Sequence, residues 1–261
     1  MIEKYDRIGS DYNYSRKADP YLSQRLLFHL QVESHGQYLD IGCGTGNYTI
    51  ALAQAGISFI GVEPAQKMLD VARKKSSRIA WKQGKAEAIP LGDQVVEGAI
   101  ASLTIHHWTD LQQGFRELYR VIKTQGQLVI FTASPVQMKG YWLCHYFPKM
   151  LAQSIEQMPE IKQVLAHLKA VGFKNIRQEK YLIRPSQIDL FLYAGKDRPA
   201  LYLDPKVRAG ISSFADLAHQ EEVNRGLGQL TQDLASGYIE TVQQQYKNTE
   251  GDYLYVIAER D

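Results

Sequence analysis

The feature that most constrains this chain is a loop with glycine at every second position, between an apolar strand pattern and a helix pattern. The loop is Asp40-Ile41-Gly42-Cys43-Gly44-Thr45-Gly46, and the next apolar run, 58–63, ends in Glu63. Glycine permits tight turns and lets a ligand approach the main chain without meeting a Cβ atom. Strand, glycine loop, helix, strand and acid in this order predict a βαβ unit whose acid binds the ribose of a nucleotide.

The glycine spacing separates two classes of nucleotide-binding loop. A dinucleotide fingerprint needs Gly or Ala at position 47, but this chain has Asn47, and its third glycine lies one place earlier. The Asp40–Gly46 pattern resembles motif I of the class I S-adenosylmethionine (SAM)-dependent methyltransferases. Four further blocks resemble later motifs of that family, in the same order: Glu63-Pro64, 84–91, 98–108 and 116–130.

The hydrophobic patterns and this resemblance imply an α/β fold: a Rossmann-like, mostly parallel, seven-stranded sheet with helices on both faces. The expected strands are 37–41, 58–63, 79–83, 95–102, 127–133, 173–183 and 252–258. The expected helices are two within 1–35 (the second at 20–33), then 46–56, 65–75, 110–123, 158–170, 187–192, 215–225 and 228–245.

A long segment, 184–251, separates the last two expected strands. An insertion of this length in a compact domain is usually a lid or a cap. We therefore expect three parts: an N-terminal helical lid, 1–35; a SAM-binding domain, 36–183 plus 252–261; and a helical cap inserted before the last strand, 184–251.

The resemblance implies that SAM is the cofactor and gives individual residues a role. Asp40 would orient the glycine loop or the SAM ammonium group, Glu63 would hold both ribose hydroxyls, and the Ala86 amide would meet the adenine ring. Lys85 occupies a place where many family members have Asp, and lysine cannot accept a hydrogen bond. The residues expected at the cofactor are Tyr14, Arg16, Asp40, Gly42, Cys43, Gly44, Gly46, Glu63, Pro64, Ala86, Glu87, Ser102 and Leu103.

Tyr14 and Arg16 belong to an aromatic-rich segment, 5–16. It resembles the helix with which small-molecule methyltransferases close over SAM, and an Arg there would bind the SAM carboxylate through its planar fork. The alternative is a surface helix with an ordinary arginine.

The acceptor is expected beyond the fourth and fifth strands. His106 is the candidate catalytic base, because its ordinary pKa of about 6.5 suits proton transfer near neutrality; the alternative is a histidine packed beneath the following helix. The expected substrate pocket comprises His106, His107, Tyr141, Trp142, His145 and Tyr146. The aromatic members could instead pack the cap against the core.

Composition favours a compact partner. The net charge is only +2, so no chain-wide field favours nucleic acid or an anionic membrane. Two cysteines, without metal-ligand spacing, predict neither a disulfide framework nor a metal site. The charged start of the chain and the lack of a long apolar run lead us to expect a cytoplasmic monomer or homodimer that methylates a small molecule. The alternatives are a SAM-binding protein that transfers nothing, as a sensor or assembly subunit, and an NAD(P)-dependent oxidoreductase.

Overall fold

The computed structural model describes residues 15–33 and 35–261. Its elements in chain order are α3 (Pro20–Leu30), β1 (Gln37–Ile41), α4 (Asn47–Ala53), β2 (Ser58–Glu63), α5 (Gln66–Lys75), β3 (Ala80–Gln83), β4 (Val96–Ser102), the 3₁₀ helix η1 (Ile105–His107), α6 (Leu111–Val121), β5 (Ile122–Thr132), α7 (Pro135–Lys139), α8 (Leu143–Tyr146), α9 (Pro148–Glu156), α10 (Ile161–Val171), β6 (Phe173–Tyr181), the 3₁₀ helix η2 (Pro199–Leu203), α11 (Pro205–Ala209), the π-helix η3 (Ser213–Leu217), α12 (Gln220–Ser236), α13 (Ile239–Gln245) and β7 (Tyr253–Arg260).

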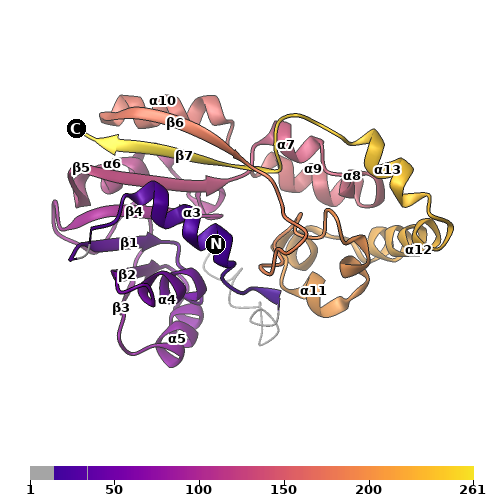
Figure 1. Cartoon of the computed structure of the whole chain (residues 1–261), viewed down its shortest axis with the longest axis horizontal. Coiled ribbons are helices and arrows are strands. Elements are labelled where there is room, and N and C mark those ends of the chain that lie inside the picture. Colours follow the sequence, from indigo (N-terminus) through magenta and orange to yellow (C-terminus); the bar gives the residue numbers. More distant parts are fainter. Residues whose placement is uncertain (1–14, 34) are drawn as a thin grey trace.

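The seven strands form one sheet in the order β3-β2-β1-β4-β5-β7-β6. Strands β1 to β5 are parallel to one another, and β7 lies antiparallel between β5 and β6. The expected mostly parallel, seven-stranded fold is therefore confirmed. Because β1, β2 and β4 run in the same direction, their carboxyl ends meet at the edge of the sheet that faces the cap (Figure 1).

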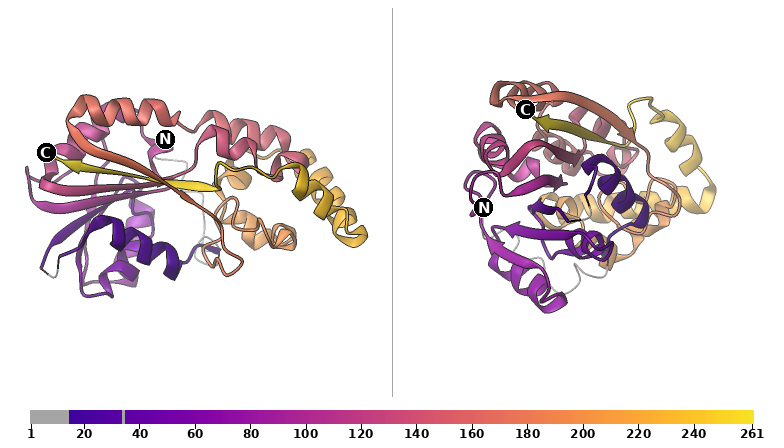
Figure 2. Two further views of the ribbon diagram at one scale, coloured as in Figure 1. Left: turned by 45° about the horizontal axis from the view of Figure 1, so that its top comes forward. Right: turned by 60° about the vertical axis from the view of Figure 1, so that its left-hand side comes forward.

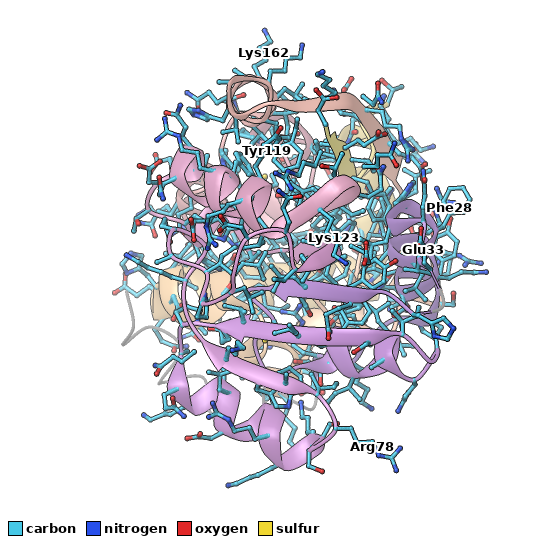
Figure 3. All side chains as sticks on the ribbon, turned by 90° about the vertical axis from the view of Figure 1, so that its left-hand side faces the viewer. Phe28, Glu33, Arg78, Tyr119, Lys123 and Lys162 are labelled. Carbon is cyan, nitrogen blue, oxygen red and sulfur yellow. The ribbon has the colours of Figure 1, made fainter. Side chains whose placement is uncertain are left out.

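Side-chain alternation along the strands builds one hydrophobic core on each face of the sheet. On β5, Val129 and Phe131 join the core that contains the buried leucines of α3, whereas Leu128 and Ile130 join the core beneath α6 and α10. Figure 3 shows the two layers from the side, with Phe28 of α3 and Tyr119 of α6 on opposite sides of the sheet.

Helix α3 begins where the sequence predicts a break. Asp19 is its N-cap and accepts a hydrogen bond from the Leu22 amide, and Pro20 is its first residue. Leu22, Leu26 and Leu30 are buried on one face of the helix. The first expected N-terminal helix and Tyr14 lie outside the described residues.

A helical cap projects beyond the carboxyl edge of the sheet (Figures 1 and 2). It contains the expected inserted segment, 184–251, and also helices α7 to α9, which follow β5 and for which no helices were predicted. The division of the chain into three domains stays a prediction. Within residues 15–33 and 35–261, every helix is too short or too polar to cross a lipid bilayer.

Two helix predictions in the cap are wrong. Residues 187–192 form an irregular loop rather than a helix. The break predicted around Gly226 does not exist, because α12 runs unbroken from Gln220 to Ser236. Gly226 instead lets the helix pack closely: a Cβ atom there would lie 2.4 Å from the Tyr146 carbonyl oxygen and 2.6 Å from the Phe147 ring.

Candidate active site

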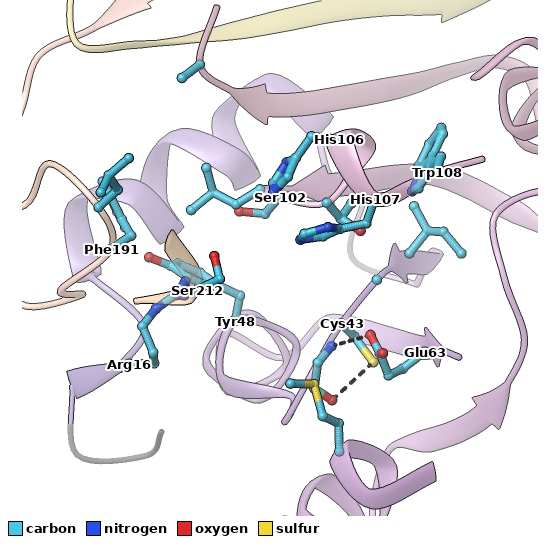
Figure 4. Close-up of a pocket in the computed structure, with 18 of the residues that line it drawn as sticks. Arg16, Cys43, Tyr48, Glu63, Ser102, His106, His107, Trp108, Phe191 and Ser212 are labelled. Atoms are coloured by element: carbon cyan, nitrogen blue, oxygen red, sulfur yellow. Dashed lines mark hydrogen bonds between the residues drawn. The ribbon is translucent and has the colours of Figure 1, made fainter. Parts of the chain in front are cut away.

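A cavity of about 230 Å³ lies between the carboxyl ends of β1, β2 and β4 and the cap. Figure 4 shows that the strand ends and the cap both contribute side chains to its wall: Cys43 and Glu63 come from the strand ends, and Phe191 and Ser212 come from the cap. The predicted site residues on this wall are Arg16, Asp40, Gly42, Cys43, Gly44, Glu63, Pro64, Ala86, Glu87, Ser102, Leu103, His106 and His107. The strand order thus brings together residues as far apart in the chain as Asp40 and His107.

The three loop glycines have positive φ angles of 73°, 55° and 77° at Gly42, Gly44 and Gly46, but only one faces open space. A Cβ atom on Gly42 would lie 2.1 Å from the Thr104 hydroxyl oxygen, and one on Gly46 would lie 2.4 Å from the Trp81 ring. A Cβ atom on Gly44 would have the Met68 sulfur as its nearest neighbour, 3.7 Å away. Gly44 is therefore the place where a ligand can approach the main chain, whereas Gly46 is not on the cavity wall.

Asp40 ends up almost fully buried at the end of β1, 2% exposed. Its carboxylate accepts a hydrogen bond from the Thr49 hydroxyl at 2.6 Å. Burial raises the pKa of Asp40 to about 7, against the lowering effect of that hydrogen bond. A group with this pKa can change its charge at neutral pH when a cation binds beside it.

Glu63 bridges the glycine loop and the start of α5. One carboxylate oxygen accepts from the Gly44 amide at 3.0 Å and the other from the Ala65 amide at 3.1 Å. Burial raises the pKa of Glu63, while these two hydrogen bonds lower it. A carboxylate offers about four lone-pair positions, so each oxygen can still accept one hydroxyl proton. The residues present therefore fit a ribose diol, with Gly44 as the open cradle beside it.

On the predicted adenine side, Ala86, Lys85 and Glu87 all line the cavity. The Glu87 carboxylate, however, accepts hydrogen bonds from the amide and hydroxyl of Thr109 and from the Asp110 amide. Burial alone would raise the pKa of Glu87, but these bonds outweigh it and lower the pKa. Its carboxylate therefore holds the segment that leads into α6 in place.

The residues after β4 form the part of the cavity wall beside the glycine loop, since β4 pairs with β1. Leu103 adopts a positive φ of 51°, and the chain then turns through η1, whose His106 and His107 rings lie 3.8 Å apart between centroids. Both rings line the cavity (Figure 4). The short 3₁₀ turn thus presents a titratable side chain where the sequence predicted one.

Arg16 lies on the wall, but its guanidinium is bound within the protein. Its Nε donates to Asp189 of the cap at 2.7 Å, and the Tyr48 hydroxyl donates to the same carboxylate at 3.0 Å. Asp189 is 1% exposed; burial raises its pKa and Arg16 lowers it. This cluster joins the N-terminal segment, helix α4 and the cap at the edge of the cavity.

Four predicted substrate-pocket residues do not line the cavity, namely Tyr141, Trp142, His145 and Tyr146. Tyr141 stacks on Tyr193 with centroids 3.9 Å apart, and Trp142 meets the edge of Tyr202. His145 pairs with Gln229 of α12. These side chains pack the inside of the cap, so their assignment to the pocket is wrong, and the alternative role in packing holds.

Sequence reasoning missed the residues that support the glycine loop and the residues that the cap contributes to the cavity wall. Thr49 and Thr104 act through contacts that only the fold creates, and Lys75 donates to the Thr45 carbonyl at 3.1 Å and to Asn47 at 2.7 Å. The cap contributes Met138, Ser154, Gln157, Met158, Asp189, Phe191, Leu192, Ile211, Ser212, Ser213 and Leu217. Nothing local in the sequence distinguishes these from ordinary cap residues.

Comparison with known proteins identifies the family. A family model for a methyltransferase domain matches residues 39–130. A demethylmenaquinone methyltransferase from Lactobacillus johnsonii is 32% identical over 174 residues, covering 56% of this chain and 71% of the relative. A solved structure from Anabaena variabilis, described as a methyltransferase of an antibiotic biosynthesis pathway, aligns with a TM-score of 0.83 and 32% identity, covering 94% of this chain and 98% of that chain.

A more distant structure shares the fold. Phosphoethanolamine N-methyltransferase 2 from Haemonchus contortus, solved with SAM, aligns with a TM-score of 0.61 at 18% identity, covering 99% of this chain and 56% of that chain. The alternatives of a dehydrogenase and of a protein that only binds SAM are set aside by these matches. Because the sequence of the glycine-loop region and the whole fold lead to the same family, the chain belongs to the class I SAM-dependent methyltransferases.

Proposed function

We propose that this enzyme methylates a small, uncharged and largely apolar molecule held between the cofactor and the cap. The observation that carries the proposal is the cavity at the strand ends, whose wall runs from the Glu63 carboxylate to apolar cap side chains such as Phe191 and Ile211. A concave, mainly apolar site with few polar groups suits a small organic ligand.

The cofactor half would be held by this chain's own polar groups. Glu63 would accept the ribose hydroxyls, the main chain at Gly44 would lie against the ligand, and Asp40 would face the ammonium group. Pro64, Ala86, Ser102 and Leu103 would complete the wall. SAM supplies a methyl group on a positively charged sulfur, which leaves as a neutral thioether when an acceptor electron pair bonds to the methyl carbon.

Replacing Glu63 tests the cofactor half. Glu63→Ala removes two charge-assisted hydrogen bonds to the ribose, each worth about 1.5–3 kcal/mol, so the affinity for S-adenosylhomocysteine should fall on the order of 100-fold. Isothermal titration calorimetry measures this. Glu97→Ala is the matched control, because Glu97 is also a strand acid but pairs with Lys123 away from the cavity. Equal affinity in Glu63→Ala and the control would contradict the assignment.

The charge of the cap wall supports an uncharged acceptor. Among the described cap residues that line the cavity, Asp189 is the one ionisable side chain, and Arg16 already pairs with it. A protonated amine would therefore lose water without gaining an unpaired carboxylate, which is costly. The relative from L. johnsonii, whose name gives demethylmenaquinone as its acceptor, agrees with a neutral and apolar ligand.

A pair of probes tests this preference. The enzyme with labelled SAM should transfer methyl groups to 1,4-dihydroxynaphthalene or 1-naphthol at least tenfold faster than to 1-naphthylmethylamine, which is cationic at neutral pH. The amine shares the ring system, so the comparison keeps the apolar part of the acceptor constant. A faster reaction with the amine would refute the proposed acceptor class.

We further propose that His106 is the group that takes the acceptor's proton. Positioned general bases typically contribute 10²–10⁴-fold, so His106→Gln should lower kcat about 100-fold or more while leaving the affinity for S-adenosylhomocysteine within about twofold. His145→Gln is the matched control, since His145 lies in the cap away from the cavity wall. A normal kcat and an unchanged pH profile in His106→Gln would reject the role.

A further inference from the structure

Two buried serines form a polar spot on the cap wall of the cavity. Ser154 on α9 and Ser213, the first residue of η3, are 5% and 7% exposed. Their hydroxyl oxygens lie 2.7 Å apart in a hydrogen bond, and both residues line the cavity. The pair is formed by two segments that are 59 positions apart in the chain.

The hydrogen-bond count of this pair leaves capacity for a ligand. Two hydroxyls have two protons and four lone pairs. The bond between them uses one proton and one lone pair, and no second protein partner of either hydroxyl is found in the described part of the chain. One proton and several lone pairs therefore remain on a cavity wall.

The apolar surroundings strengthen any hydrogen bond that a ligand makes to these two hydroxyls. The other side chains that the cap contributes to this wall are mainly apolar, including Met138, Met158, Phe191, Leu192, Ile211 and Leu217. In apolar surroundings a hydrogen bond is stronger than in water, and an unmet polar group costs free energy. A ligand that covers this wall would therefore gain by placing one oxygen on the serine pair.

The backbone conformation places the serines in this position. Residues 213–217 form a π-helix, closed by the hydrogen bond from the Ala218 amide to the Ser213 carbonyl oxygen at 3.1 Å. The wide turn presents Ser212, Ser213 and Leu217 together on the cavity wall. Such π segments are rare and often occur at functional sites.

We infer that the Ser154–Ser213 pair determines acceptor specificity by binding an uncharged hydroxyl or carbonyl oxygen of the acceptor. The inference rests on the proposed function and adds the chemical class of the group that is recognised. A purely structural role, in which the bond only ties α9 to η3, predicts a loss of stability but no change in ligand preference. The two roles can therefore be separated by measuring binding of ligands that differ in one oxygen.

The experiment compares 1-naphthol with naphthalene, each titrated by fluorescence into protein saturated with S-adenosylhomocysteine. The wild-type protein should bind 1-naphthol about tenfold more tightly than naphthalene, the value of one hydrogen bond. In Ser154→Ala/Ser213→Ala the two ligands should bind within about twofold of each other. Ser236→Ala is the matched control, because Ser236 is exposed at the end of α12, and it should keep the wild-type ratio.

Folding and cofactor binding are checked in the same samples by titration with S-adenosylhomocysteine, which should not change. If the double variant does not fold, Ser213→Cys, which keeps the size of the side chain, is measured in its place and should also lose the preference. A tenfold preference that persists in a folded serine variant overturns the inference and leaves the proposed function intact. Failure of the wild-type protein to bind either naphthalene ligand overturns both the inference and the proposed function. The S-adenosylhomocysteine affinity of Glu63→Ala tests the proposed function alone, and its loss supports that function without deciding the role of the serine pair.

Discussion

At the scale of a single residue, Asp40 makes the free energy of unfolding depend on pH. Its carboxyl group is buried and holds a hydrogen bond from Thr49, and its pKa is raised from 3.8 to about 7. Between these two values the folded protein retains a proton that the unfolded chain releases. The free energy of unfolding therefore falls as pH rises from about 4 to 7, and the loss is complete above the folded pKa.

The variant Asp40→Asn should remove this pH dependence. Asn keeps an oxygen for the Thr49 hydroxyl but cannot ionise. The two proteins should be similarly stable near pH 4, and the variant should become the more stable one by up to about 4 kcal/mol at pH 8. Urea unfolding at several pH values measures the difference, which cancels the other titrating groups. A difference that does not change with pH would contradict the shifted pKa of Asp40.

At the scale of an element, α12 contains two glycines whose surroundings differ. Gly226 is buried against α8 and leaves no room for a side chain, whereas Gly228 is exposed, with no atom within 4 Å of an added Cβ. Two glycines two residues apart predict a helix break from the sequence. The structure instead uses one for close packing and tolerates the other.

This pair of glycines gives a matched prediction. Gly228→Ala should raise the free energy of unfolding by about 0.5–1 kcal/mol, the usual gain in helix propensity. Gly226→Ala should lower it by about 1–3 kcal/mol, because overpacking outweighs that gain. Thermal or urea unfolding of both variants checks the signs. Stabilisation by Gly226→Ala would show that α12 is not packed closely against the Tyr146–Phe147 segment.

At the scale of the whole molecule, residues 15–19 cross between the sheet domain and the cap. The Leu190 amide donates to the Ser15 carbonyl at 2.9 Å, and the Asn47 side chain donates to the Arg16 carbonyl at 2.7 Å. The buried Arg16–Asp189 ion pair is part of the same crossing. The segment therefore ties the two parts of the molecule at the rim of the cavity.

Breaking the ion pair should be costly. Asp189→Ala leaves a largely buried guanidinium without its carboxylate and should lower the free energy of unfolding by about 3 kcal/mol. It should also speed trypsin cleavage after Arg16 and Lys17. Asp70→Ala is the control, because the Asp70–Arg73 pair is exposed and should contribute less than about 1 kcal/mol. Equal effects in urea unfolding would show that the crossing does not depend on Asp189.

The sequence predicts those features of the fold that depend on residues close together in the chain. All seven strands were predicted to within a few residues except β5, which begins five residues earlier, at Ile122, because it pairs there with Val96. Alternating and helical hydrophobic patterns are local, so they can be recognised without the fold. The cavity position of Asp40 and Glu63 followed from the rule that parallel strands end at one edge.

The sequence by itself therefore determined the family, the sheet and the strand-end residues of the cavity wall, since each depends on short-range patterns along the chain. Only the tertiary structure decided the cap side of the cavity. Tyr141, Trp142 and Tyr146 are buried within the cap, while Ser154, Asp189 and Ser213 reach the wall from three separate segments. Which face of a cap helix meets the cavity is set by packing between segments distant in the chain, and no local pattern records that choice.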